Sequence, residues 1–135
     1  MKSPHLLRVD DPPDRFAPLI EAARAEGLRV GWLELTDAID VPEILAPAAG
    51  LGVLRAVAAG GGRTVAVKPL RGAPVLKDLL REHFLGCALV LIRGEVDAPR
   101  LAPDGEAWRV ESPGEAAKAW STGQLVEAMR SPKGT

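Results

Sequence analysis

Residues 87–92, Cys-Ala-Leu-Val-Leu-Ile, form an unbroken apolar run that constrains the fold more than any other feature of the chain. A strand with one face in water alternates apolar and polar residues, whereas a strand covered on both faces does not. Before this run, residues 74–85 repeat apolar side chains with the period of a helix, and Gly86 separates the two segments. A helix followed by a doubly buried strand predicts an α/β protein with a partly parallel sheet.

The first part of the chain predicts the same alternation of strands and helices. Residues 6–9 predict one strand, and residues 28–35 predict a second. Between them a helix is expected to begin with Asp11 as its cap and Pro12 at its first position, and to end at Gly27. The buried face of this helix is expected to consist of Phe16, Leu19, Ile20 and Ala23.

Three further segments carry patterns typical of helix starts. Residues 40–43, Asp-Val-Pro-Glu, predict a short helix near residues 41–49, which Pro47 would interrupt. Residues 112–115, Ser-Pro-Gly-Glu, predict that another helix opens there. Residues 121–124, Ser-Thr-Gly-Gln, resemble a capping box, which predicts that a helix restarts at this point.

Two β-hairpins are also expected. Residues 53–59 and 63–68 flank three consecutive glycines, and glycine enters positive φ without a steric penalty, so the glycines predict a turn. A helix over residues 51–59 is the alternative for the first of these segments. Residues 100–102 and 106–110 flank Pro-Asp-Gly, a sequence typical of a tight turn.

These segments together predict the architecture. We expect a mixed, partly parallel sheet of about five to seven strands with three or four helices, arranged in two or three layers. Residues 1–135 are expected to form a single α/β domain, because the length suits one domain and neither a repeat nor a linker interrupts it.

Composition and charge exclude several classes of function. The 17 Lys and Arg residues are balanced by 18 Asp and Glu residues, without a basic stripe, which argues against nucleic-acid binding through phosphate contacts. No apolar run reaches the ~20 residues that a membrane span needs, and the N-terminus shows no signal-peptide pattern. The single cysteine, Cys87, allows no internal disulfide. We therefore expect a soluble, cytoplasmic protein, and the scarcity of Asn, Gln and Tyr suggests a GC-rich bacterial genome.

Charged residues follow several expected strands and could form a ligand site. Ligands of parallel α/β sheets bind beyond the carboxyl ends of the strands, so parallel strands would bring such residues together and antiparallel strands would scatter them. Carboxylates at this edge suit Mg²⁺, and a basic side chain beside them suits a phosphate. The alternative, which we favour, is that these residues cap helices or are solvated. The candidate ligand-binding residues are Asp10, Asp11, Asp37, Lys68, Arg71 and Arg93.

Catalytic and cofactor motifs give no support for an enzyme. His83 and Cys87 are four residues apart, but the break at Gly86 separates them, so they do not predict a Cys–His nucleophile. The three glycines at residues 60–62 lack the G-x-G-x-x-G spacing of a dinucleotide site. The sequence therefore predicts neither a catalytic residue nor a bound cofactor.

Two tryptophans are candidates for a protein interface. Trp108 falls on an expected hairpin and Trp120 between two expected helices, and tryptophan is enriched at interfaces. Core packing is the alternative for either residue. We expect a non-catalytic α/β interaction module that forms a homodimer or binds an unidentified protein or small ligand. The alternative is a small-molecule, phosphate or Mg²⁺ site at the carboxyl edge of the sheet, which would allow an enzymatic role.

Overall fold

The computed structural model describes residues 3–131, and its contacts group the chain into two compact units. The first unit contains Met1–Leu35 and Lys77–Thr135, and the second contains Thr36–Leu76. The structure has a mixed sheet of six strands, a second sheet of two strands and four α-helices, which confirms the predicted α/β class. The single-domain assignment stays a prediction, because a compact unit need not fold on its own.

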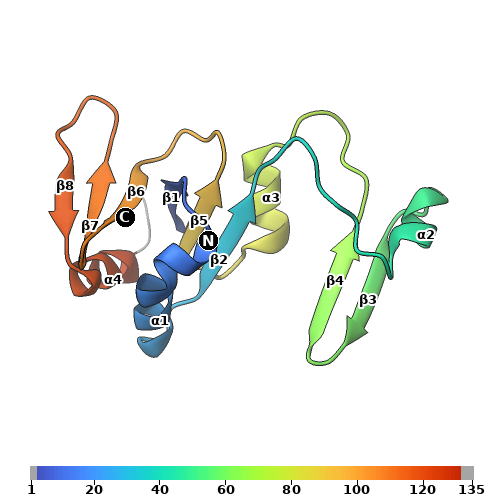
Figure 1. The fold of residues 1–135 in the computed structure, drawn as a ribbon, viewed down its shortest axis with the longest axis horizontal. Helices are drawn as coiled ribbons and strands as arrows, with labels where there is room; N and C mark the ends of the chain where they lie inside the picture. The colour runs from blue at the N-terminus through green and yellow to red at the C-terminus, as the bar shows by residue number, and fades with distance from the viewer. Residues whose placement is uncertain (1–2, 132–135) are drawn as a thin grey trace. The chain divides into compact units, whose positions relative to one another are not determined.

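The six-stranded sheet of the first unit has the strand order β2-β5-β1-β6-β7-β8 (Figure 1). β5 pairs in parallel with both β1 and β2, β1 pairs in parallel with β6, and β6, β7 and β8 follow one another in antiparallel fashion. The strands are β1 (His5–Val9), β2 (Val30–Glu34), β5 (Leu89–Arg93), β6 (Arg100–Asp104), β7 (Ala107–Glu111) and β8 (Lys118–Trp120).

Strand β5 lies inside the sheet and is covered on both faces. Its residues Leu89, Val90, Leu91 and Ile92 are all 0% exposed. Since successive side chains of a strand point to opposite faces, both faces of β5 must be covered. The prediction made from the unbroken apolar run is therefore confirmed, although the strand itself begins at Leu89.

Two helices pack beside one another in the core of the first unit: α1 (Ala17–Ala25), which follows the 3-10 helix η1 (Pro13–Phe16), and α4 (Thr122–Arg130). As predicted, Phe16, Leu19 and Ala23 are buried, whereas Ile20 is only partly buried against the same core. The Phe16 ring stacks on Trp108 at 5.8 Å between ring centroids and tilts against Trp32 at 6.0 Å. The predicted Asp11 cap is wrong, because Pro12 occupies the cap position and no side chain caps η1.

Helix α3 (Leu76–His83) is followed by Phe84, whose ring lies against Gly31 of β2. A Cβ atom added to Gly31 would overlap the ring of Phe84, the residue that follows α3. Gly31 alternates with Val30 and Trp32, which pack against the core on the other face of the strand. The absence of a side chain at Gly31 thus lets Phe84 lie directly against the sheet.

The C-terminal part of the first unit confirms one sequence prediction and corrects another. Ser121 and Gln124 form the predicted capping box: the Gln124 backbone N–H donates to Ser121 Oγ at 3.1 Å, and the Ser121 backbone N–H donates to Gln124 Oε1 at 2.8 Å. The helix predicted to open at residues 112–115 is wrong. Gly114 takes a positive φ of 76° in a turn, and the chain then extends as β8 along β7.

The second unit contains a short helix and a β-hairpin. α2 (Ala46–Gly50) is shorter than predicted, and Pro47 lies in its first turn rather than interrupting it, because that turn needs no backbone donor. The predicted hairpin is confirmed as β3 (Ala56–Gly60) and β4 (Arg63–Val67), which excludes the helical alternative. Gly61 and Gly62 form its turn with φ values of 59° and 80°.

Candidate functional site

The carboxyl edge of the six-stranded sheet brings together some of the predicted ligand residues. β1 and β2 are both parallel to β5 and therefore to each other, as the ligand-site prediction requires. Asp10 follows β1 directly, and Arg93 ends β5 in register with Val9. Asp10, Asp11 and Arg93 therefore belong to the same edge of the sheet.

Both carboxylate oxygens of Asp10 already face arginines. Arg100 Nε donates to Asp10 Oδ2 at 2.6 Å, and Arg8 Nε lies 3.7 Å from Asp10 Oδ1. Arg100 Nη1 is also 3.6 Å from Glu111 Oε2, and Arg109 Nε is 3.1 Å from Glu111 Oε1. These five side chains form a row of alternating charge across β1, β6 and β7, on the face opposite Leu7 and Val9.

The ion pairs of this row explain why the charged side chains lie here, without a bound ligand. The hydrogen bond from Arg100 to Asp10 is the main cause that raises the pKa of the Arg100 guanidinium, and the charges of Asp10, Glu111 and Asp11 add to it. Arg93 pairs similarly with Glu34, whose Oε2 lies 3.4 Å from Arg93 Nε. The part of the chain from residue 3 to 131 holds no group of three His, Cys, Asp or Glu side chains that could bind a metal ion.

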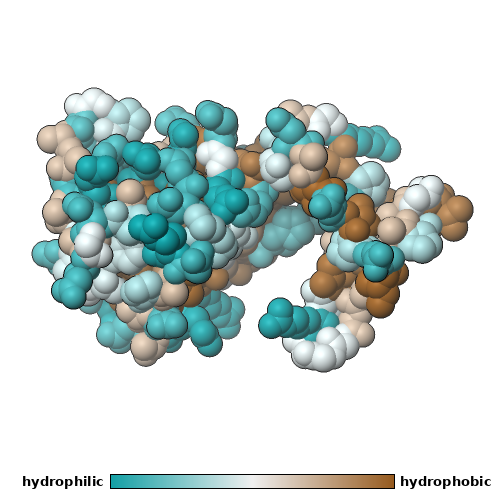
Figure 2. All heavy atoms as spheres, in the orientation of Figure 1, coloured by the Kyte–Doolittle hydropathy of each residue, from teal (hydrophilic) through white to brown (hydrophobic). Residues whose placement is uncertain are grey.

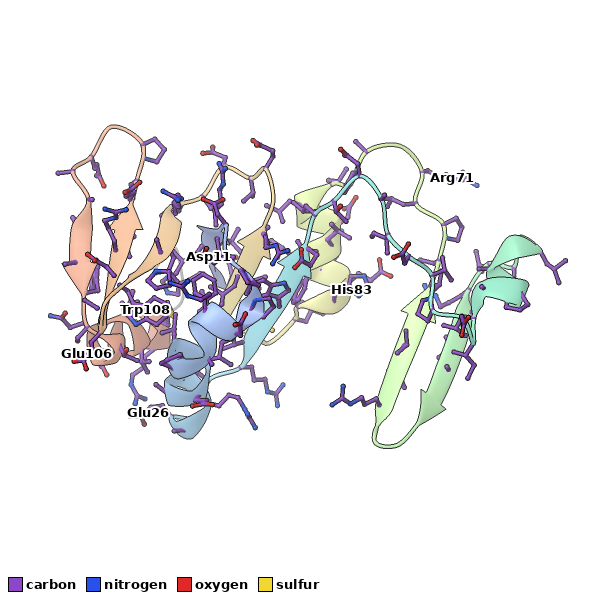
Figure 3. The ribbon with its side chains drawn as sticks, in the orientation of Figure 1. Asp11, Glu26, Arg71, His83, Glu106 and Trp108 are labelled. Atoms are coloured by element: carbon purple, nitrogen blue, oxygen red, sulfur yellow. The ribbon has the colours of Figure 1, made fainter. Side chains whose placement is uncertain are left out.

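The other three predicted ligand residues belong to the second unit. Asp37, Lys68 and Arg71 are exposed there, and Arg71 extends from the segment that follows β4 (Figure 3). The six candidates are therefore divided equally between the two units. A joint site of all six stays a prediction.

The two tryptophans proposed for an interface pack against the core. Trp108 lies on β7 (Figure 3). It is 4% exposed, and its Nε1 donates to Thr122 Oγ1 at 2.9 Å. Its ring therefore presents almost no surface to a partner. Trp120 lies on the edge strand β8 rather than between two helices, and it is half-buried against the same core.

Cys87 lies beside an open cavity of about 240 Å³, lined also by Arg29, Met129 and Arg130. Burial raises the pKa of the Cys87 thiol, and the positive charge of Arg29 offsets part of that rise. A thiol with a raised pKa is mostly protonated at neutral pH and is a poor nucleophile. That Cys87 is not part of a Cys–His pair stays a prediction.

The largest feature that the sequence analysis missed is an apolar surface on the second unit. Of the eleven large hydrophobic side chains that are exposed among residues 3–131, ten belong to Thr36–Leu76. Figure 2 shows such residues over the part of the chain that carries α2, β3 and β4. We call these ten residues the apolar surface. They are Ile39, Val41, Ile44, Leu51, Val53, Leu54, Val57, Val65, Leu70 and Val75.

The second unit buries very little of its apolar content. Leu45 and Ala56 are its only buried hydrophobic residues, whereas fourteen such residues form the core of the first unit within the described residues. Ile44, Leu51 and Leu54 are 77%, 84% and 86% exposed. The unit therefore lacks a core into which these side chains could pack.

The charges of the second unit are separated along the chain. Its acidic residues all precede α2, and its basic residues all follow it. Apart from these and two threonines, the unit consists entirely of Ala, Val, Ile, Leu, Gly and Pro. The acidic residues are Asp37, Asp40 and Glu43, and the basic ones are Arg55, Arg63, Lys68 and Arg71.

Comparisons with known proteins add no family assignment. No protein-family model matches this sequence, and no curated protein is similar to it. Between residues 3 and 131, none of the helices has the length and apolar character that a membrane crossing requires.

Proposed function

We propose that this protein is a non-catalytic interaction module whose Thr36–Leu76 unit binds a protein partner through the apolar surface. The observation that carries the proposal is the placement of ten exposed large hydrophobic side chains in a unit with only two buried ones. Single exposed hydrophobic residues are normal in proteins, but contiguous apolar surface typically marks a binding site.

The energetics of burial support this proposal. Each square ångström of apolar surface removed from water contributes about 25 cal/mol, so covering several side chains such as Leu51 and Leu54 would stabilise a complex substantially. In the first unit the equivalent side chains are buried by helices α1 and α4. In the second unit a partner would supply that cover.

The chemistry of the unit favours binding over catalysis. Thr36–Leu76 contains no His, Cys, Ser or Tyr, the side chains that most often act as nucleophiles or proton carriers. The balance of Lys and Arg against Asp and Glu favours a protein partner over nucleic acid. The single cysteine, which allows no internal disulfide, favours the cytoplasm as the compartment.

A second candidate function is a small-ligand site at the carboxyl edge of the sheet. The parallel pairing of β1 and β5 favours it, because this pairing places Asp10, Asp11 and Arg93 at one edge. The ion pairs of Asp10 and Arg93 weigh against it, since a ligand would have to replace them. The two functions separate experimentally, because replacing both Asp10 and Asp11 by Asn would abolish ligand binding but leave the apolar surface intact.

The test of the interaction module is a triple substitution of the most exposed residues. Ile44→Ser, Leu51→Ser and Leu54→Ser together remove three large apolar side chains that contribute to no core. We expect the variant to fold with an unchanged melting temperature of the first unit. We also expect it to lose the complexes that wild-type protein forms, whether with itself or with another protein, measured by light scattering and by affinity capture.

A matched control places three substitutions in the first unit. Leu85→Ser, Ala116→Ser and Ala119→Ser also change exposed residues, and these should leave every complex in place. If the triple variant at residues 44, 51 and 54 retains the same complexes as wild type, the apolar surface is not a docking surface and the proposal fails.

A further inference from the structure

The β3–β4 hairpin forms a sheet of only two strands. In the described part of the chain, the backbone of β3 is hydrogen-bonded to β4 and to no other segment. A two-stranded hairpin is marginally stable in water by itself, and three or more strands with an apolar face are usually needed. The hairpin therefore gains from the addition of strands.

The two free edges of this hairpin differ in their protection. Proteins protect exposed edges with charged residues and proline, which prevent a further strand from pairing. β4 begins with Arg63 and is followed by Lys68 and Pro69. β3 has the sequence Ala-Val-Ala-Ala-Gly, without a charged residue or proline, and Arg55, which precedes it, keeps a backbone N–H, unlike the Pro69 beside β4. The edge of β3 is therefore the one open to pairing.

The register of the hairpin determines which β3 groups point outward. Gly60 pairs with Arg63 around the two-residue turn, and a turn of this kind closes on a hydrogen-bonded pair. Hydrogen-bonded and non-hydrogen-bonded pairs then alternate along the strands. Ala58 therefore bonds to β4, whereas the backbone groups of Val57 and Ala59 point away from it.

We propose that β3 pairs with β3 of a second copy of this chain, in antiparallel orientation about a two-fold axis at Ala58. This inference rests on the proposed function and names a second copy as the partner. In this register Val57 of each copy lies opposite Ala59 of the other, and the outward N–H and C=O groups of both residues bond across the axis. The two hairpins become one four-stranded antiparallel sheet.

The chemistry of β3 fits a second copy. A two-fold interface brings the same strand of both copies together, so any charge on β3 would be repeated across the axis. β3 carries no charge, and its small side chains allow close approach. Val57 is 55% exposed and would pack near the axis in the combined sheet.

The first experiment is cysteine cross-linking at the axis. Ala58→Cys, introduced together with Cys87→Ser, places two thiols opposite each other in a non-hydrogen-bonded pair. Such pairs have Cα atoms ~4.5 Å apart, within the ~4.4–6.8 Å range of disulfides. Copper phenanthroline with oxygen as oxidant should convert most of the protein to a disulfide-linked dimer. The matched control is Ala66→Cys on β4, which should remain monomeric on a non-reducing gel.

The second experiment removes one outward donor from each edge. Val57→Pro deletes an N–H that would bond to the second copy, and Ala66→Pro deletes the outward N–H of the paired residue on β4. Neither change removes a hydrogen bond within the hairpin. By light scattering, we expect wild type and Ala66→Pro to have the mass of two chains, and Val57→Pro to have the mass of one chain.

The outcomes separate this inference from the proposed function. Cross-linking of Ala66→Cys in place of Ala58→Cys would show that β4 is the pairing edge and overturn the inference. A monomeric wild type that binds a different protein, and loses it in the triple variant at residues 44, 51 and 54, overturns the inference but supports the proposed function. A monomer that sediments with lipid vesicles and binds no protein overturns both.

Discussion

Arg100 Nε donates a hydrogen bond to Asp10 Oδ2 at 2.6 Å, which joins β6 to the end of β1. β1 and β6 share only a short parallel pairing, in which Arg8 is opposite Arg100. Asp10 lies within reach of both guanidinium groups, so it neutralises two arginines that would otherwise repel each other. The residue predicted to bind a ligand is thus one that holds two parallel strands together.

We expect Asp10→Ala to lower the free energy of unfolding. The side chains of this row are about 40% exposed, so solvent screening limits the loss to about 1 kcal/mol. Urea denaturation measures this change, and 1 M NaCl should reduce the difference between variant and wild type. Asp14→Ala, an exposed carboxylate elsewhere in the first unit, is the control and should change stability by less. A loss at Asp10 that is insensitive to salt would contradict an electrostatic role.

Gly31→Ala should destabilise the first unit through Phe84. The added Cβ overlaps the ring, and overpacking of this kind typically costs about 1–3 kcal/mol. Combining it with Phe84→Leu should give a smaller total loss than the sum of the two single changes, because the smaller side chain relieves the overlap. Urea denaturation of the four proteins forms the cycle. Additive losses would mean that Phe84 does not pack on Gly31.

The parts of the fold that could be predicted depend on residues close together in the chain. The capping box needs only Ser121 and Gln124, and the apolar composition of residues 89–92 is enough to predict the buried strand. The helix predicted at residues 112–115 was wrong because proline and glycine also start turns. The pairing of β8 with β7 selects the turn over the helix, and no pattern of neighbouring residues in the sequence predicts that pairing.

The candidate sites show the same limit. The interaction of Asp10 with Arg100 spans 90 residues of sequence and depends on the strand order, so residue type alone cannot reveal it. The apolar surface escaped prediction for a different reason. Residues such as Ile44 and Leu54 have the composition of a core, and only the structure shows that the segment around them has no core to join.

Cys87 should react slowly with alkylating reagents, in a way that depends on Arg29. Burial favours the neutral thiol, so the pKa of Cys87 in the folded protein lies above that of a cysteine in the unfolded chain. The folded protein therefore loses the stability that this group contributes as the pH rises through the folded pKa. Arg29→Gln removes the charge that opposes this effect and should raise the pKa further. The pH profile of iodoacetamide alkylation measures both values, with Arg24→Gln as the control. A lower midpoint in Arg29→Gln would refute the assignment.

Amide hydrogen exchange should distinguish the two edges of the hairpin. Val57 and Ala59 have outward N–H groups that are open to water in a monomer, whereas pairing of two copies would protect them. Their exchange should therefore slow as the protein concentration rises. The outward N–H of Ala66, on the edge closed by Lys68 and Pro69, should exchange rapidly at every concentration. The β5 amides provide the internal reference, because both faces of that strand are buried and their protection should not depend on concentration. Protection of Val57 and Ala59 that is equally strong in protein dilute enough to be monomeric by light scattering would mean that a segment of the same chain already covers the β3 edge, leaving no place there for a second copy.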